Sequence, residues 1–278
     1  MSEKPVKKGI LLAAFGSSSP VGAKALAGFY EQTRLAFPGI TVRWAFTSPH
    51  MRHRLASAGK KTDSVQKALL RMGFDRYTHV AVQPLHIIPG KEYEALLQEI
   101  DAASKKGGPA RISVGLPLLY EAEDVELAAR ALLAHLPPER RPEDAVICVG
   151  HGTWHTGAAS YQSLYECLNG RDPRIFIGTL TGEHSMESVL PGLKASGAAT
   201  VWLIPLLSVI GKHAEEDMAG KKNSAWRGYL EEAGFICRPV LKGTAECEGF
   251  ARIWIAHLAQ AFQKLDAKGA ALGTCWGK

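Results

Sequence analysis

The segment AVICVGHGTWH, residues 145–155, joins an apolar run to a histidine that stands between two glycines. The run has the length and the β-branched content of a buried strand, and the glycines allow the chain to turn sharply where the strand ends. A similar segment, AAFGSSSP at residues 13–20, closes the first apolar run of the chain. Phe15-Gly16-Ser17 therefore stands in the first segment where His151-Gly152-Thr153 stands in the second.

A second pair of similar segments follows in the same order. QPLHIIPGKE at residues 83–92 matches IPLLSVIGKH at residues 204–213, and in both the last residue comes eight positions after the proline. That last residue is Glu92 in the first half and His213 in the second. Two repeats in the same order predict two similar lobes that face each other across a cleft. Ligands are expected at the carboxyl ends of the strands.

Short apolar runs alternate with amphipathic stretches along the chain, which is typical of βα units and parallel sheets. The predicted fold class is α/β, with two Rossmann-like lobes. The polar stretch LPPERRPED at residues 136–144 is the candidate linker, so the predicted lobes are residues 1–140 and residues 141–278, the second carrying most of the candidate ligands. Strands are expected at residues 9–15, 41–46, 79–84, 111–115, 145–150, 175–180, 200–206 and 235–239. Helices are expected at residues 21–37, 64–72, 92–103, 122–135, 186–195, 224–233 and 249–265, followed by a flexible tail at residues 266–278.

The composition is that of a globular chain without a membrane span. Of the 278 residues 46% are hydrophobic, and the longest apolar runs fall far short of the roughly 18 residues that a membrane-spanning helix requires. We expect no export signal, because the basic N-terminus leads into an apolar run that lacks a small-residue cleavage site. The five cysteines are scattered and form no C-x-x-C pair, so a reducing cytoplasm is the expected location.

The formal net charge of +6 favours an anionic partner. The basic residues are dispersed, and the sequence contains no recognised nucleic-acid-binding motif. An anionic small molecule is therefore the better expectation, with neither nucleic acid nor membrane among the partners. The oligomeric state is left open, and a homo-oligomer is permitted.

His151 and His213 are the candidate metal ligands. Each follows an apolar strand, so both are expected at the carboxyl edge of the second sheet, where two histidines can converge on one ion. Taken alone, His151 fits better as a structural histidine bonded to backbone, and His213 as a surface residue that opens an acidic helix. As a pair they favour a metal site, because neutral imidazole suits cobalt, iron, nickel and zinc. His151 is also the candidate proton acceptor, since histidine titrates near neutral pH.

Glu183, in GTLTGEH after a strand, is the candidate third ligand and a candidate catalytic carboxylate. It fits equally well as an acid that interacts with the dipole of the helix beginning near Ser185. Glu92, the counterpart of His213 in the repeat, is a second candidate catalytic carboxylate, which would face the cleft from the first lobe. His86 lies in an apolar loop, where a structural histidine is the better interpretation.

Other kinds of site are not indicated. FGSSS lacks the spacing of a nucleotide phosphate loop, and no G-x-G-x-x-G follows a strand, so neither ATP nor NAD is expected. The serines of this turn lack the G-x-S-x-G pattern of a hydrolase and fit better as the cap of a helix beginning near Pro20. His151 and His155 are spaced like a helical zinc pair, but the glycine and threonine between them favour a loop.

Together these motifs resemble the class II chelatases, and within them the cobaltochelatases of anaerobic cobalamin synthesis, which act on sirohydrochlorin. The matching segments lie between about residue 8 and residue 262 and are LLAAFGSS, WAFTS, QPLHIIPGKEYE, VGHGT, IGTLTGE and IPLLSVIGKHAEEDMAG. The resemblance implies a chelatase-like fold of two Rossmann-like lobes with the macrocycle in the cleft between them. It also implies a metal held by His151, His213 and a nearby glutamate, and a reaction without nucleotide.

The chain departs from the family at the acid. The family's glutamate usually follows the G-T-[VL] of this strand directly, and Thr181 occupies that position here. Glu183 would reach the same side if the backbone stayed extended, since residues two apart in a strand share a face. If the backbone turns, the acid is lost or supplied by Glu92.

The expected activity is that of a metal chelatase of the lyase class, which inserts Co²⁺ as a substrate into sirohydrochlorin without ATP. Fe²⁺ in place of Co²⁺, giving sirohaem, is an alternative, because the ligands His151, His213 and Glu183 do not distinguish the two ions. A carrier that binds a tetrapyrrole or a metal without turnover is an alternative of a different class. A periplasmic metal-binding protein would require an export signal, and a hydrolase would depend on Ser17.

Overall fold

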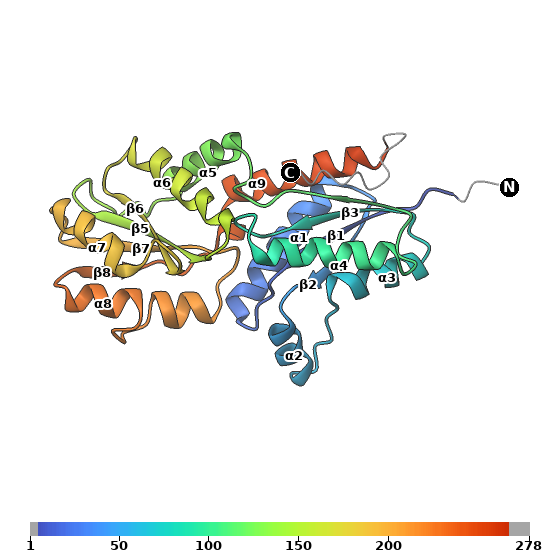
Figure 1. Cartoon of the computed structure of the whole chain (residues 1–278), viewed down its shortest axis with the longest axis horizontal. Coiled ribbons are helices and arrows are strands. Elements are labelled where there is room, and N and C mark those ends of the chain that lie inside the picture. The colour runs from blue at the N-terminus through green and yellow to red at the C-terminus, as the bar shows by residue number, and fades with distance from the viewer. Residues whose placement is uncertain (1–4, 267–278) are drawn as a thin grey trace.

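The computed structural model describes residues 5–266, and within this range the chain forms two α/β lobes placed side by side along the long axis (Figure 1). The first sheet contains β1 (Lys8–Ala14), β2 (Thr41–Phe46), β3 (His79–Pro84) and β4 (Arg111–Val114). The second contains β5 (Ala145–Gly152), β6 (Ile175–Thr181), β7 (Thr200–Leu206) and β8 (Ile236–Pro239). Every strand pair is parallel. The orders β2-β1-β3-β4 and β6-β5-β7-β8 match strand for strand, so the predicted fold class and the two similar lobes are confirmed.

The helices agree with the predicted ones except at two places. Those that were expected are α1 (Pro20–Ala36), α3 (Val65–Phe74), α4 (Lys91–Ser104), α5 (Ala122–Ala134), α7 (Met186–Ala195), α8 (Trp226–Glu232) and α9 (Glu248–Lys264). The prediction lacked α2 (Pro49–Ser57) and α6 (Ala159–Asn169). α2 buries a single residue, Leu55, so the sequence shows no apolar stripe from which this helix could be predicted. Its start, with Ser48 as the N-cap and Pro49 in the first turn, is nevertheless typical of a helix. Of the tail predicted at residues 266–278, all but Asp266 lies outside the described residues.

Both faces of each sheet are covered. Along β1, Ile10 and Leu12 pack into one apolar cluster, while Leu11 and Ala13 pack into another. A continuous apolar run in a central parallel strand has this outcome, because alternate residues point to opposite faces and helices cover both. β5 behaves in the same way. The side chains on both faces of the central strands are thus buried in the core. A functional site is therefore expected in the loops that follow the carboxyl ends of these strands.

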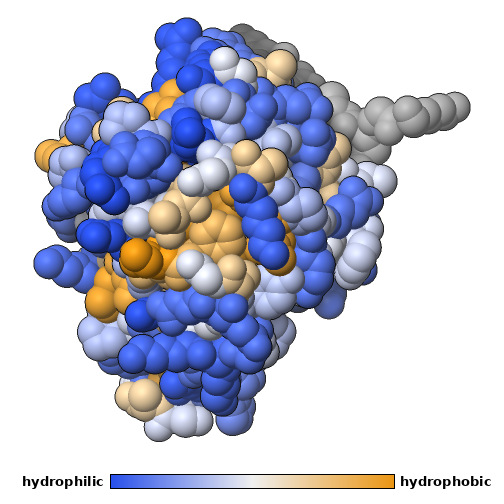
Figure 2. All heavy atoms as spheres, turned by 90° about the vertical axis from the view of Figure 1, so that its left-hand side faces the viewer, coloured by the Kyte–Doolittle hydropathy of each residue, from blue (hydrophilic) through white to orange (hydrophobic). Residues whose placement is uncertain are grey.

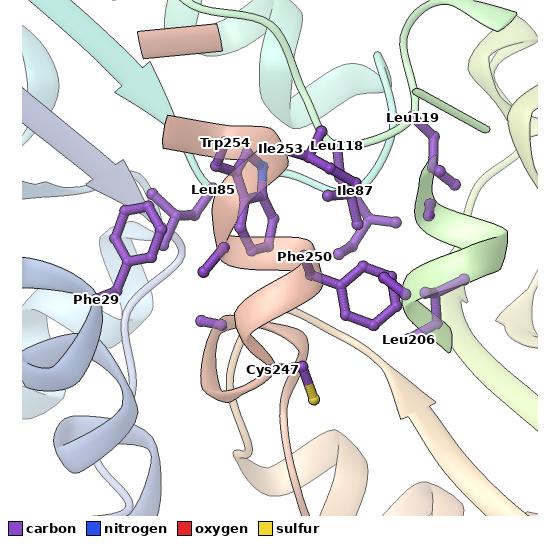
Figure 3. Close-up of a cluster of buried hydrophobic side chains, with 14 of the residues drawn as sticks. Phe29, Leu85, Ile87, Leu118, Leu119, Leu206, Cys247, Phe250, Ile253 and Trp254 are labelled. Carbon is purple, nitrogen blue, oxygen red and sulfur yellow. The ribbon is translucent and has the colours of Figure 1, made fainter. Parts of the chain in front are cut away.

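The last helix of the chain returns to the first lobe. α9 packs against β3 and β4 of the first sheet, and also against α5. Figure 3 shows Trp254 and Phe250 of α9 between Phe29 and Leu85 of the first lobe and Leu206 of the second. The rings of Phe29 and Trp254 meet edge to face with centroids 5.9 Å apart. This apolar cluster is shared by both lobes and sets how they face each other.

A buried acid and histidine reinforce the same junction. His257 of α9 places Nε2 2.8 Å from Oδ1 of Asp124 in α5, and Nδ1 3.1 Å from the carbonyl oxygen of Leu116. Asp124 also accepts hydrogen bonds from the backbone N–H groups of Tyr120 and Glu121. Asp124 and His257 are 6% and 5% exposed. Polar groups removed from water to this degree are stabilising only while each keeps its partner.

The surface has both polar and apolar areas. Figure 2 looks onto the end of the second lobe, where α7 and α8 lie, and shows mainly hydrophilic residues around an apolar area near the centre. Within residues 5–266 no helix has both the length and the hydrophobicity needed to cross a membrane.

Candidate metal centre

The second sheet brings the two candidate histidines to one edge. β5 and β7 are neighbours, with Gly150 beside Leu206 at their carboxyl ends. β6 lies on the other side of β5, so the connections that leave β5 and β7 run toward opposite ends of the sheet. Parallel α/β sheets open a crevice at such a switch point. His151, at the end of β5, and His213, after β7, both lie in this crevice.

The two imidazole rings are close and nearly perpendicular. The ring centroids of His151 and His213 are 5.0 Å apart, and the ring planes make an angle of 83°. With metal–nitrogen distances of about 2.1 Å and nitrogen–metal–nitrogen angles of about 90° to 110°, two imidazoles on one ion have centroids about 4.6 to 5.3 Å apart. The observed separation therefore fits two ligands of a single ion.

In both rings Nδ1 has a partner within the protein. Nδ1 of His151 is 3.2 Å from the carbonyl oxygen of Gly152. Nδ1 of His213 is 2.7 Å from Oδ2 of Asp217, four residues further along the π-helical turn His213–Met218. A nitrogen that faces an acceptor carries the proton, which leaves Nε2 with a free lone pair. Nε2 of each ring is therefore the nitrogen available to a metal.

A cavity of about 320 Å³ opens beside the histidines. Asp217 and Glu187 line it together with His151 and His213, and Thr181 belongs to its wall. The hydroxyl of Thr181 donates a hydrogen bond to the carbonyl oxygen of His151. Two imidazoles and two carboxylates border this cavity. Imidazole is a donor that suits a divalent transition metal.

The backbone turns where the family's acid was expected. β6 ends at Thr181, and Gly182 follows with φ of 103°, so the strand does not continue to Glu183. Glu183 is exposed and does not line the cavity, whereas Glu187, on the first turn of α7, does. The condition under which Glu183 would share a face with Thr181 is therefore not met. The assignment of Glu183 as a ligand stays a prediction.

Glu92 lies at the start of α4 in the first lobe and is exposed. It does not line the cavity beside His151 and His213. The negative charge of Glu92 acts on Tyr161, which lies in α6 of the second lobe. Burial raises the pKa of Tyr161 to about 12, and the charge of Glu92 adds to this rise. The Tyr161 hydroxyl accepts a hydrogen bond from the N–H of Gly152, directly after His151. The catalytic role of Glu92 stays a prediction.

His86 is built into the protein interior. Both its ring nitrogens are buried without a hydrogen-bond partner. Burial lowers the pKa of His86 to about 4, and the charge of Glu92 opposes this only in part. The ring is therefore neutral at physiological pH. It is buried, as expected of a structural histidine, but neither nitrogen has the hydrogen-bond partner that buried polar groups normally have.

The loops at the carboxyl ends also hold the lobes together. Nε2 of His155 lies 3.0 Å from Oε1 of Glu94 in the first lobe. On the other side, the hydroxyl of Ser17 donates a hydrogen bond to the carbonyl oxygen of Ile210, which precedes His213 by three residues. The serine turn after β1 thus positions the β7 loop, a role that sequence patterns did not indicate. His155 lies in a loop, as predicted, and not on a helix with His151.

Asp217 and Glu187 were missed as candidates at the sequence level. Asp217 follows His213 by four residues, which places both on one face of a helix, so the spacing in HAEED was an available signal. Glu187 has no such signal, because its position depends on the turn at Gly182. Among residues 5–266, no three His, Cys, Asp or Glu side chains are grouped so that they could hold a metal ion.

We expect Gly152→Ala to destabilise the protein and to disturb the metal centre. Gly152 has φ of 77°, and a Cβ there would overlap the carbonyl oxygen of Thr181. The left-handed backbone alone costs about 1 to 3 kcal/mol for a non-glycine residue, and the overlap would push the end of β5 away from β6. The free energy of unfolding and the Co²⁺ affinity should both fall. Gly39→Ala is the matched control, since Gly39 has φ of 78° with open space around it; equal losses in both variants would refute the steric argument.

The chain has clear relatives among characterised proteins. A family model described as cobalt chelatase (CbiK) matches residues 8–263. The sirohydrochlorin cobaltochelatase CbiKC of Nitratidesulfovibrio vulgaris is 52% identical over 260 residues, which cover 94% of this chain and 92% of that one. The sirohydrochlorin cobaltochelatase of Salmonella typhimurium is 29% identical, over 92% of this chain and 97% of that one.

Solved structures share the two-lobed fold. SirB from Bacillus subtilis with Fe³⁺ has a TM-score of 0.64 at 16% identity, covering 92% of this chain and 96% of that one. The structure of CbiX, described as the terminal enzyme of siroheme biosynthesis in denitrifying bacteria, has a TM-score of 0.58 at 13% identity, covering 91% and 99%. At these identities the likeness concerns the fold alone, and it confirms the chelatase-like arrangement.

The family assignment rests on the extent of these matches. The family model spans almost all of the described residues, and a relative at 52% identity aligns with nearly the whole chain. The resemblance that the motifs indicated is therefore confirmed: this chain belongs to the cobalt chelatase (CbiK) family.

Proposed function

We propose that this chain inserts Co²⁺ into sirohydrochlorin without nucleotide, as a sirohydrochlorin cobaltochelatase. The observation that carries the proposal is the pairing of His151 and His213, whose ring centroids are 5.0 Å apart at the carboxyl edge of the second sheet. The family membership and the named activity of the relative at 52% identity support the same substrates.

The proposed reaction exchanges two pyrrole protons for one Co²⁺, and no electron changes hands. Co²⁺ binds to Nε2 of His151 and of His213, with positions left open. Such a site can exchange protein ligands for pyrrole nitrogens one at a time, which a closed four-ligand site would resist. As pyrrole nitrogens replace imidazole, His151 regains a free lone pair and takes up a proton. The second proton passes to a carboxylate or to water.

Three glutamates are candidates for that carboxylate. Glu183 and Glu92 were expected from sequence, and Glu187 lines the cavity. We propose that the second proton is accepted by a glutamate on the cavity wall or by one on the opposite lobe. The variants Glu183→Gln, Glu92→Gln and Glu187→Gln, compared in one assay, distinguish these glutamates. A general acid or base contributes about 10² to 10⁴ in rate. Loss of this size in Glu187→Gln alone would transfer the role predicted for Glu183 and Glu92 to Glu187.

The test is a multiple-turnover assay under anaerobic conditions. Sirohydrochlorin and Co²⁺ are mixed with substoichiometric protein, and the absorbance change on metal insertion is followed against a reaction without protein. The proposal predicts many equivalents of cobalt-sirohydrochlorin per protein, with no requirement for ATP. Binding of sirohydrochlorin with one equivalent of product or less would favour a carrier. A parallel series with Fe²⁺ decides between cobalt and iron.

The same proposal includes partners and location. We propose sirohydrochlorin or a similar polycarboxylate tetrapyrrole as the anionic partner that the net charge of +6 favours. We propose the cytoplasm as the compartment. The assembly that we propose to test is a homo-oligomer. Size-exclusion chromatography with light scattering measures the last of these.

A further inference from the structure

We infer that Asp217 is a positioning residue of the metal centre, which fixes the tautomer and the orientation of His213 so that Nε2 faces the ion. The inference deepens the proposed function and rests on it for the identity of the metal. It begins from the contact between Oδ2 of Asp217 and Nδ1 of His213, which is 2.7 Å long.

The contact has the geometry of a strong, charge-assisted hydrogen bond. Distances of about 2.7 to 2.9 Å are typical when a carboxylate accepts from a nitrogen. An ionised carboxylate offers only acceptors, so the proton must lie on Nδ1 of His213. The lone pair is then on Nε2. A carboxylate behind a metal-binding histidine fixes its tautomer and raises its basicity.

The local backbone places the two side chains on one face. Residues 213–218 form a π-helical turn, which is rare and frequently occurs at functional sites. Ala214 and Met218 of this turn are fully buried, so packing anchors it to the second lobe. The side chains of His213 and Asp217 stay 46% and 47% exposed. The carboxylate is therefore carried by a turn that packing anchors, while the imidazole lines the cavity.

The neighbouring acids do not share this placement. Glu216 is paired with Lys212 at 3.4 Å and does not line the cavity, while Glu215 lies within 3.3 Å of the Ser19 hydroxyl of the first lobe. Glu216 thus provides a matched control, since it is an adjacent carboxylate on the same turn. Removing it removes one negative charge without touching His213.

The tautomer is measured first, on the protein without metal. Long-range ¹H–¹⁵N correlation spectra of the histidine rings, recorded above pH 8 where free imidazole is neutral, report which nitrogen of His213 carries the proton. We expect Nδ1–H in the wild type and in Glu216→Ala, and a mixture of tautomers in Asp217→Ala. A wild-type His213 protonated at Nε2 would overturn the inference.

Metal binding is measured second, with Co²⁺ alone as the probe. Calorimetry should give a 10- to 100-fold weaker Co²⁺ affinity for Asp217→Ala, which is the usual cost of losing such a partner, and no change for Glu216→Ala. The visible ligand-field bands of bound Co²⁺ should shift in Asp217→Ala. Asp217→Asn can present either its amide oxygen or its NH₂ group to Nδ1, so it should leave a mixture of tautomers and restore the affinity only in part. If Asp217→Ala bound Co²⁺ as tightly as the wild type and Glu216→Ala, the inference would be wrong.

Failure of this inference differs from failure of the proposed function. If the wild type forms cobalt-sirohydrochlorin but Asp217→Ala matches Glu216→Ala in Co²⁺ affinity, the function stands and the positioning role is lost. If Asp217→Ala weakens Co²⁺ binding as expected but the wild type never turns over sirohydrochlorin, the positioning role stands and the function is lost.

Discussion

His151→Ala is expected to lower the rate of cobalt insertion by about 10² to 10⁴, the range found when a general base is removed. His151 combines two roles in the proposed reaction, as a ligand of Co²⁺ and as acceptor of a pyrrole proton. Its ring is exposed at the end of β5, 5.0 Å between centroids from that of His213. Loss of the imidazole therefore removes half of the metal site and the base at once. The measurement is the initial rate of insertion at saturating sirohydrochlorin.

His155→Ala serves as the control for this prediction. His155 lies four residues further on, does not line the cavity, and is bonded to Glu94 of the first lobe. We expect its rate of insertion to stay within a few-fold of the wild type. Equal rates for His151→Ala and the wild type would remove His151 from the mechanism. A loss in His155→Ala as large as in His151→Ala would place the effect in the interlobe contact instead.

Asp124→Ala is expected to reduce the free energy of unfolding by about 2 to 4 kcal/mol, because it leaves the buried His257 without its partner and removes a helix cap. Asp124 also caps the start of α5 through the backbone N–H groups of Tyr120 and Glu121. Urea unfolding at neutral pH measures the change. Glu123→Ala is the matched control, because Glu123 is an exposed acid on the same turn. A loss below about 1 kcal/mol, as for an exposed ion pair, would contradict the account of this junction.

The contribution of Asp124 should also depend on pH. Burial alone would raise the pKa of Asp124, but hydrogen bonds from His257 and from backbone N–H groups outweigh burial and hold the pKa below its ordinary value of 3.8. A carboxylate with a lowered pKa in the folded state stabilises it fully above the unfolded pKa and loses this effect as pH falls through the folded one. The stability difference between wild type and Asp124→Asn should therefore be largest near neutral pH and shrink below about pH 4. A difference that grew on acidification would reverse the sign of this argument.

The architecture was predictable from sequence because it depends on local patterns, namely short apolar runs and repeated segments. Apolar runs such as residues 9–14 and 145–150 are buried on both faces in parallel sheets. The repeated segments ending at Glu92 and His213 predicted the two-lobed arrangement. The convergence of His151 and His213 also follows from topology, since both leave neighbouring parallel strands at the same edge. These are consequences of periodicity and connection rules.

The acids of the site were harder to predict, because their positions depend on single backbone turns. Whether Glu183 follows β6 or leaves it depends on Gly182, whose φ of 103° no periodicity indicates. The spacing of four between His213 and Asp217 is present in the sequence, but the sequence does not show that the carboxylate meets Nδ1 of His213. The return of α9 to the first lobe likewise depends on long-range packing of Trp254 against Phe29, which a pattern within the helix cannot specify.

The most direct test of the central claim, that His151 and His213 bind the metal, is X-ray absorption at the cobalt K-edge of the Co²⁺-loaded protein. The wild type should show a nitrogen and oxygen shell with the outer scattering of two imidazoles. Each of His151→Ala and His213→Ala should lose one imidazole, and the double variant should lose both. An unchanged imidazole signal in the double variant, or none in the wild type, would contradict the account.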